Sequence, residues 1–267
     1  MIRDITIGQY YKADSVIHRL DPRVKLMGTL IFIISLFMGM NIWIYAVVTV
    51  ALAGGLKMSR IPLKFMVRGL KSIVILIIIS AVFNLFLTPG DVLIQIWKLT
   101  ITYQGLKMAI FMVVRLIYLI VGTSLMTLTT TPNNLTDGLE KGLGFLKVIK
   151  VPVHEIAMMM SIALRFIPIL IEETDKIMKA QMARGADFEN GSLIKRAKAM
   201  VPILVPLFVS AFRRANELAM AMEARCYHGS EGRTKMKPLK YEKRDRIAYI
   251  SMILYLGVII IVKIIAA

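Results

Sequence analysis

The sequence contains a single cysteine, only three histidines, and half as many acidic as basic residues. With Cys226 alone, the chain has no disulfide framework and no multi-thiolate metal site. The histidines His18, His154 and His228 lie far apart, and no second histidine follows His154-Glu155 at the spacing of a zinc protease. A P-loop and a nucleophile with a nearby base are also missing from the sequence. We therefore expect a protein that is not an enzyme and that holds no cofactor and no metal.

The chain is rich in apolar residues and positive charge. Of its 267 residues 57% are hydrophobic, and the formal net charge is +17. The mean hydropathy is +0.68 and the isoelectric point is about 10.1. This apolar content excludes a disordered chain, and its long runs do not fit a soluble nucleic-acid binder. The composition predicts an all-α integral membrane protein with a basic cytoplasmic side.

Uncharged runs predict about five transmembrane helices. The run 26–56 would be about 46 Å long as one helix, against a hydrocarbon core of about 30 Å. Basic residues flank it at both ends, so we predict a hairpin that turns near 39–41 and keeps both basic clusters inside. Further spans are predicted at 72–90, 106–128 and 247–262, which places the N-terminus in the cytoplasm. The basic stretch 57–71 and the segment before Gly105 are expected to be loops, and no cleavable signal sequence is predicted.

Three side chains within these spans support predictions of their own. Trp43 and Tyr45 follow the hairpin turn and are predicted to anchor at the outer interface. Arg115 lies inside the fourth span, where a charge costs about 2.5–3.5 kcal/mol. It either lines a substrate path, or it faces neighbouring helices or snorkels outward. No other mid-span ionisable residue accompanies it, which argues against an ion-coupled carrier.

The segment 131–246 forms neither predicted spans nor an ordinary soluble domain. Its apolar residues recur at helical spacing over 153–183 and again over 192–225, which predicts two long amphipathic helices on the cytoplasmic side. Methionines are frequent on both helices, and they are either an adaptable interface or simple apolar filler. The helices are predicted to end alike, each with an arginine between two small residues: Ala183-Arg184-Gly185 and Ala224-Arg225-Cys226. Such arginines either stabilise a helix C-terminus through its dipole or are presented to a carboxylate of a partner.

Four motifs resemble one known family, the transmembrane T component (EcfT) of bacterial energy-coupling factor transporters. The similar segments are His18-Arg-Leu-Asp21-Pro22-Arg-Val-Lys25-Leu, the stretch 129–141 after the fourth span, the stretch 151–168, and the Ala-Arg-Gly motif within 178–188. The resemblance covers nearly the whole chain and is most specific in its middle third.

The resemblance implies a non-catalytic subunit of a vitamin or metal importer. Two cytoplasmic ABC-type ATPases would hydrolyse ATP, and a small membrane S component would bind the substrate. Arg184 and Arg225 would insert into grooves on the ATPases, together with their neighbours Ala183, Gly185, Ala224 and Cys226. Cys226 departs from the glycine, serine or alanine that is commoner in the family at its position. The S component would contact Met158, Met159, Met160 and Pro168.

The implied organisation has three parts. Residues 1–130 would form a membrane bundle of about four spans, 131–245 a cytoplasmic coupling domain, and 246–267 a final span. The lipid bilayer is expected as a partner, and no nucleic acid is. The alternatives are a self-sufficient carrier, a conventional ABC permease that binds substrate itself, and a membrane enzyme that acts on lipid-linked substrates.

Overall fold

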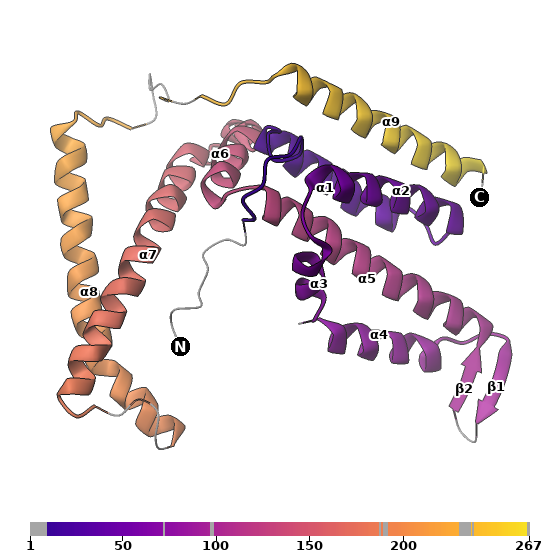
Figure 1. Ribbon diagram of the computed structural model, residues 1–267, viewed down its shortest axis with the longest axis horizontal. Helices are drawn as coiled ribbons and strands as arrows, with labels where there is room; N and C mark the ends of the chain where they lie inside the picture. Colours follow the sequence, from indigo (N-terminus) through magenta and orange to yellow (C-terminus); the bar gives the residue numbers. More distant parts are fainter. Residues whose placement is uncertain are drawn as a thin grey trace. The chain divides into compact units, whose positions relative to one another are not determined.

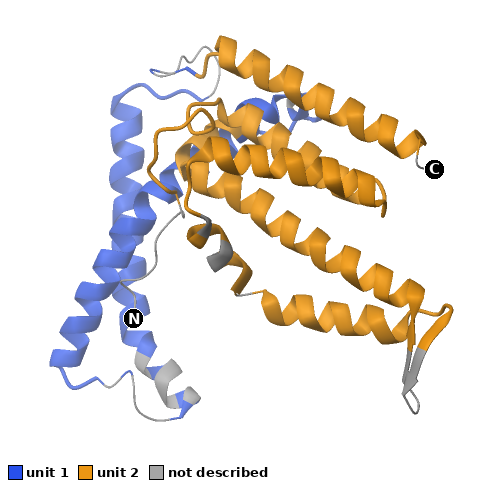
Figure 2. Ribbon diagram, turned by 45° about the vertical axis from the view of Figure 1, so that its right-hand side comes forward, with its two compact units in different colours: residues 1–7, 139–238 blue, residues 8–138, 239–267 orange. Residues whose placement is uncertain are grey.

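The chain forms two compact units, shown in Figure 2. The computed structural model describes residues 10–71, 73–96, 99–186, 188, 192–229, 236 and 238–265. The bundle unit comprises residues 8–138 and 239–267, and the long-helix unit comprises 139–238 together with 1–7. The all-α prediction is confirmed, apart from one short β-hairpin. The proposed three-part division of the chain stays a prediction.

The predicted apolar runs are the long helices of the bundle unit (Figure 1). Their bounds are α1 (Pro22–Phe37), α2 (Ile42–Ser59), α4 (Val74–Leu87), α5 (Tyr103–Thr129) and α9 (Lys243–Ile265). The predicted hairpin is confirmed, since α1 ends at Phe37 and α2 begins at Ile42. At this turn the Asn41 side chain accepts a hydrogen bond from the backbone N–H of Trp43, which caps α2.

Helix α5 packs against α1, α2, α3 and α4, and α9 covers α1 and α2. Close approach depends on small residues, as is common between membrane helices. A Cβ atom on Gly122 of α5 would lie 2.3 Å from the ring of Phe32 on α1. Two apolar clusters fill the interior: Leu36, Ile44, Tyr45, Val48 and Ile259 in one, and Leu52, Ile61, Met66, Val121 and Leu128 in the other.

Several short elements lie where we expected loops. The basic stretch after α2 contains helix α3 (Leu63–Lys71), so the prediction of a loop there was wrong over these residues. Lys64 and Lys71 are seven residues apart, a spacing that places them on one face of a helix. The number of basic residues in the stretch did not by itself reveal this spacing. An antiparallel hairpin of β1 (Val92–Ile96) and β2 (Leu99–Thr102) connects α4 to α5 (Figure 1). Helix α6 (Pro132–Gly142) and the short 3₁₀ helix η2 (Gly144–Ile149) follow α5.

Within the described residues, four helices are long and apolar enough to cross a membrane: α2, α5, α7 and α9. The number rises to five if α4 is joined to the C-terminal part of α3, from which it is bent by 61°. Helix α1 has 16 residues. At about 1.5 Å per residue it is shorter than a hydrocarbon core of about 30 Å, so α1 reaches only part of the way through an average bilayer. Helix α7, which we did not assign as a span, meets the length and hydropathy criteria.

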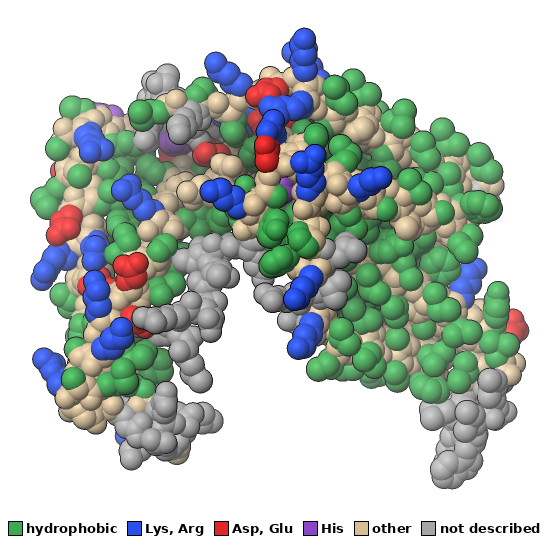
Figure 3. All heavy atoms as spheres, viewed as in Figure 1, with side chains coloured by type: hydrophobic (Ala, Val, Ile, Leu, Met, Phe, Trp, Pro, Cys, Tyr) green, Lys and Arg blue, Asp and Glu red, His purple; other side chains and the backbone are tan. Residues whose placement is uncertain are grey.

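The long-helix unit consists mainly of two helices that cross, α7 (Val153–Ala183) and α8 (Leu193–Ala224). Their bounds confirm the two long helices predicted from periodicity. Each helix continues through its internal prolines, Pro168 in α7 and Pro202 and Pro206 in α8. Figure 3 shows charged side chains distributed along this pair, whereas hydrophobic side chains cover much of the bundle unit.

Candidate partner-binding site

The crossing of α7 and α8 is fixed by one acidic side chain. Glu173 of α7 accepts hydrogen bonds from the Ser210 hydroxyl at 2.6 Å and from the Arg214 guanidinium at 2.8 Å, both on α8. These two donors lower the pKa of Glu173, the Ser210 hydroxyl most of all. On one side of this polar link, a groove of about 270 Å³ is lined by apolar side chains of both helices: Ile162, Phe166, Leu170, Leu218 and Met222. The two helices therefore meet at a defined point and in a defined register.

Helix α7 ends in a Schellman motif built by the backbone. The N–H of Ala186 bonds to the carbonyl of Gln181 at 3.0 Å, and the N–H of Gly185 bonds to the carbonyl of Met182 at 2.9 Å. Gly185 has φ +90°, the left-handed conformation that this motif requires after the cap residue. Arg184 is that cap residue.

Helix α8 ends in the same way. The N–H of Tyr227 bonds to the carbonyl of Met222 at 3.0 Å, and the N–H of Cys226 bonds to the carbonyl of Glu223 at 2.8 Å. Cys226 occupies the left-handed position with φ +54°, where α7 has glycine. Arg225 thus holds the same position in its motif as Arg184 does in α7. The sequence indicated that the two ends match, and the backbone shows that they are one conformation used twice.

The two arginine side chains are not needed to close these helix ends. Backbone N–H groups already satisfy the terminal carbonyls. Both arginines are exposed, and neither guanidinium has a hydrogen bond or an ion pair with any residue that the structure describes. A guanidinium carries five N–H donors and can pair with a carboxylate through two of them. Each helix end therefore presents, on a backbone fixed by the cap, a guanidinium that pairs with none of the described residues and can form a bidentate pair with a partner.

The two helix ends are well separated within the unit. Figure 1 shows α7 and α8 crossing with roughly opposite chain directions, so that their C-termini lie at different ends of the pair. The contacts agree, because Glu173 near the end of α7 meets Ser210 in the middle of α8. Two separated guanidinium groups fit two binding sites better than one shared site.

Glycine and cysteine at the left-handed positions are expected to respond oppositely to substitution. Gly185→Ala places a Cβ in the left-handed region and should lower the stability of the α7 end by about 1–2 kcal/mol. Nothing lies within 4 Å of that Cβ, so backbone strain is the only cost. Cys226→Gly removes the same strain and should raise stability by up to about 1 kcal/mol. Thermal unfolding of the two purified variants should shift in opposite directions; equal shifts would contradict this account of the caps.

The residues proposed for the S component are only partly grouped. Met159 and Met160 are 58% and 41% exposed, and Pro168 is exposed too, while Met158 is half-buried. Consecutive helical residues point about 100° apart, so the three methionines cannot share one face. The assignment of Met158, Met159, Met160 and Pro168 to the S component stays a prediction.

A buried polar network in the bundle unit was not predicted. Asp245 is 3% exposed and accepts hydrogen bonds from the backbone N–H groups of Asp21 and Glu242, both at 2.8 Å. Lys25 donates to the backbone carbonyls of His18 at 3.1 Å and Thr129 at 2.8 Å. The network ties the N-terminus of α1 to the N-terminus of α9 and the C-terminus of α5.

The same network explains the charged motif at the N-terminus. Asp21 caps α1 by accepting from the N–H of Arg23, and the two side chains form an ion pair at 2.9 Å. The Arg23 guanidinium lies 3.8 Å above the ring of Tyr241, just before α9. In the sequence, the signal for this network was the cluster of charges immediately before the apolar run of α1. It did not reveal that Asp245, far away in the sequence, completes the network.

The histidines and Arg115 have structural partners. His18 contacts the Ser15 hydroxyl at 2.7 Å and the Tyr11 carbonyl at 3.0 Å, and burial lowers its pKa. His154 pairs with Glu140 at 2.8 Å. Among the described residues, no group of three or more His, Cys, Asp or Glu side chains could hold a metal ion.

Arg115 faces neighbouring helices, the second of the two interpretations. It is buried, donates from Nε to the Tyr45 hydroxyl at 3.0 Å, and lies over the ring of Phe37 at 5.1 Å. Tyr45 is therefore not an interfacial anchor, because its hydroxyl is used inside the bundle at 6% exposure. Trp43, at 67% exposure, lies on the surface, and its role as an interfacial anchor stays a prediction.

Comparison with known proteins places the chain in a class of transporter subunits. A family model described as CbiQ, cobalt transport protein, matches residues 13–236. The chain is 57% identical over 250 residues to the energy-coupling factor transporter transmembrane protein EcfT of Clostridium kluyveri, covering 93% of each chain. It is 48% identical over 254 residues to the EcfT protein of Bacillus subtilis, covering 95% of this chain and 96% of that protein. The chain thus belongs to the family of multi-pass transmembrane components of energy-coupling factor transporters.

Proposed function

We propose that this chain is the mechanical link of an importer for a vitamin or a metal, joining two cytoplasmic ABC-type ATPases to a small substrate-binding S component. The observation that carries the proposal is the duplicated cap, in which Arg184 and Arg225 occupy equivalent positions at the ends of two crossed helices. The two arginines are chemically equal and well separated, so they suit a pair of similar partner proteins. In this proposal the N-terminus and the long-helix unit are cytoplasmic.

Each arginine enters a groove on one ATPase and forms a bidentate pair with a carboxylate there. The neighbouring Ala183, Gly185, Ala224 and Cys226 are small, so the surface of a partner can approach the cap closely. The arginine's backbone is fixed by the hydrogen bonds of the cap, which limits the entropy lost on binding. The chain itself catalyses no reaction, and hydrolysis belongs to the ATPases.

The two long helices transmit the movement. Helix α7 has 31 residues and α8 has 32. At about 1.5 Å per residue they are about 46 and 48 Å long, so a displacement at one end is carried over the thickness of a membrane. The hydrogen bonds from Ser210 and Arg214 to Glu173 hold the two helices together, so that they move as one rigid pair. ATP binding would move the two caps together or apart, and this movement would tilt or release the S component, which we propose contacts Met158, Met159, Met160 and Pro168.

The composition of the complex tests this proposal. We expect the tagged chain, purified in mild detergent from its own host, to retain two ATPases and a small, very apolar membrane protein, each identified by mass. The identity of that last protein would name the substrate. Recovery of the chain alone, together with solute transport by the chain alone in liposomes, would overturn the proposal in favour of a self-sufficient carrier. A conventional permease would co-purify with ATPases but without a small membrane protein.

A further inference from the structure

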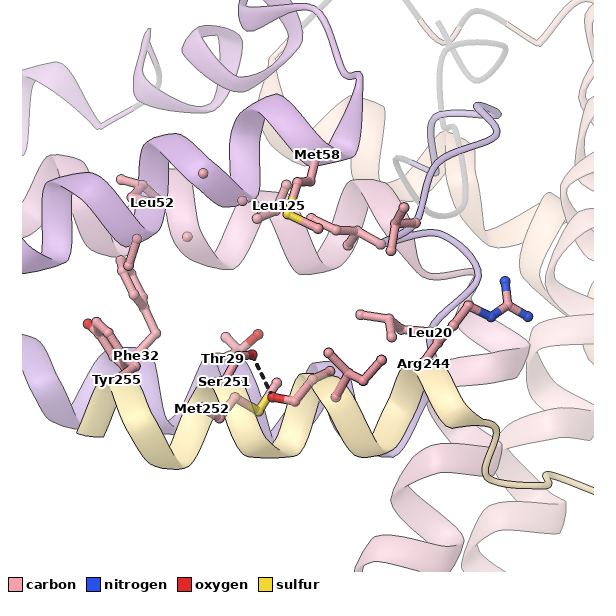
Figure 4. Close-up of a pocket in the computed structure, with 18 residues that line it drawn as sticks. Leu20, Thr29, Phe32, Leu52, Met58, Leu125, Arg244, Ser251, Met252 and Tyr255 are labelled. Atoms are coloured by element: carbon pink, nitrogen blue, oxygen red, sulfur yellow. Dashed lines mark hydrogen bonds between the residues drawn. The ribbon is translucent and has the colours of Figure 1, made fainter. Parts of the chain in front are cut away.

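The bundle unit contains an apolar cavity of about 460 Å³ between α1, α2, α5 and α9. Figure 4 shows Phe32 and Tyr255 at one end of it, Leu20 and Arg244 at the other, and Leu52 and Leu125 along the wall. This volume lies within the range of about 300–1,000 Å³ that is typical of sites for small molecules. The cavity is therefore large enough for a ligand and not merely a packing defect.

The polar groups along the cavity are already satisfied within the protein. The Thr29 hydroxyl donates to the carbonyl of Lys25 at 2.8 Å, and the Ser251 hydroxyl donates to the carbonyl of Ala248 at 2.8 Å. The Tyr255 hydroxyl shares a 2.7 Å hydrogen bond with Ser35. A polar occupant would lose its hydrogen bonds to water and gain few in return, so the interior selects an apolar occupant.

One wall of the cavity is open because α2 carries glycine there. A Cβ added to Gly54 would meet nothing within 4 Å, and one added to the adjacent Gly55 would come no closer than 3.3 Å to Leu125. Two successive glycines in a helix interior cost about 1–2 kcal/mol relative to alanine, since each costs about 0.5–1 kcal/mol. The missing side chains leave room beside α2 for a chain-like ligand.

A second, polar pocket of about 480 Å³ shares residues with the cavity at its Arg244 end. Both pockets are lined by Val16, Met58 and Arg244. The polar pocket is lined by four cations and one carboxylate: Arg19, Lys57, Arg60, Arg244 and Asp14. It lies where α2 ends and α9 begins, and Figure 3 shows lysines and arginines gathered near the start of α9.

Two of these cations form no hydrogen bond or ion pair with the described residues. Arg19 pairs with Asp14, and Arg244 pairs with Glu242. The hydrogen bond from Arg19 is the first cause that lowers the pKa of Asp14, and the charge of Arg60 lowers it further, so Asp14 stays ionised. Lys57 and Arg60 have no hydrogen-bond or ion-pair partner in the part of the chain that the structure describes.

We propose that the two pockets together bind one anionic phospholipid, with an acyl chain in the apolar cavity and the phosphate group at Lys57 and Arg60. The uncharged run of α2 ends at Leu56, so these cations lie at the level where the headgroups of a bilayer begin. Basic pockets between transmembrane helices at this level select anionic headgroups. The bound lipid connects α2, α9 and the segment before α1, and so adds to the links that the Asp245 network makes.

Lipid retention measured by native mass spectrometry tests the proposal. The full-length protein is purified in detergent and incubated in mixed micelles with phosphatidylglycerol or with phosphatidylcholine of the same chain length. We expect one phosphatidylglycerol to be retained per chain, and at least about tenfold less phosphatidylcholine. Equal retention of the two lipids would overturn the proposal.

Three variants assign the effect to the two pockets. Lys57→Gln with Arg60→Gln should lower phosphatidylglycerol retention about tenfold and bring it to the level of phosphatidylcholine. Gly54→Leu, which fills open space, should lower the retention of both lipids. Lys107→Gln removes an exposed cation at the other end of α5 and should change neither. Unchanged retention in the Lys57/Arg60 variant, or displacement of the lipid by glycerol phosphate as effectively as by intact phosphatidylglycerol, would contradict a lipid site.

Discussion

Replacing both cap arginines by alanine, as Arg184→Ala with Arg225→Ala, is expected to abolish association with the ATPases and ATP-driven uptake. Truncating one partner of a buried charge pair costs about 2–5 kcal/mol. This corresponds to a loss of affinity of about thirty- to several-thousand-fold for each arginine. Each single variant should therefore weaken association, and the double variant should leave none at cellular concentrations. Co-purification of the ATPases and uptake in cells measure the two effects.

The caps make this experiment easy to interpret. The helix ends are closed by backbone hydrogen bonds, so removal of the guanidinium groups leaves the fold unchanged. Arg213→Ala is the matched control, because Arg213 is an exposed arginine in the middle of α8 and should not affect association. Arg184→Lys keeps the charge but loses the planar fork, and should restore only part of the binding. A double variant that retains its ATPases and its uptake would refute the assigned role of the caps.

Asp245→Ala is expected to cause the largest loss of stability in the bundle unit. The substitution leaves the backbone N–H of Asp21 without its acceptor in a buried site and that of Glu242 without its acceptor in a partly buried one. An unsatisfied buried donor costs about 1–3 kcal/mol, and the partly buried donor adds to this cost. The N-termini of α1 and α9 would also lose the negative charge that favours them. Thermal unfolding of the purified protein should begin at a markedly lower temperature.

An exposed carboxylate in the same unit provides the control. Asp14 pairs with Arg19 on the surface, where the side chains are 69% and 58% exposed. Exposed pairs contribute about 0–1 kcal/mol, so Asp14→Ala should leave thermal unfolding nearly unchanged. If both variants unfolded alike, Asp245 would not be the central element of the network.

Much of the architecture could be predicted because it follows from local patterns. The bounds of α7, α8 and the hairpin between α1 and α2 follow from apolar periodicity and from the charges that flank each run. Helix α3 was missed because its basic residues were counted and their helical spacing was not used. The β-hairpin was missed because its strands are short and bounded by an apolar helix on either side.

The candidate site likewise has features that the sequence predicted and features that it did not. The matched tripeptides around Arg184 and Arg225 were visible in the sequence, because a cap is local. The left-handed conformation of Cys226 was not visible, since nothing in the side chain of cysteine favours it. The partners of Asp245 and of Arg115 lie far away in the sequence, and only the packing of helices brings them together.

The most direct test of the central claim is site-specific cross-linking at the two caps. A photoreactive amino acid in place of Ala183, and separately in place of Ala224, is activated in the complex purified from its host, and the cross-linked protein is identified by mass. The account predicts that both positions cross-link to an ATPase, and that the same residue placed at Arg213 does not. Cross-linking of both positions to lipid or to a small membrane protein, with none to an ATPase, would contradict it.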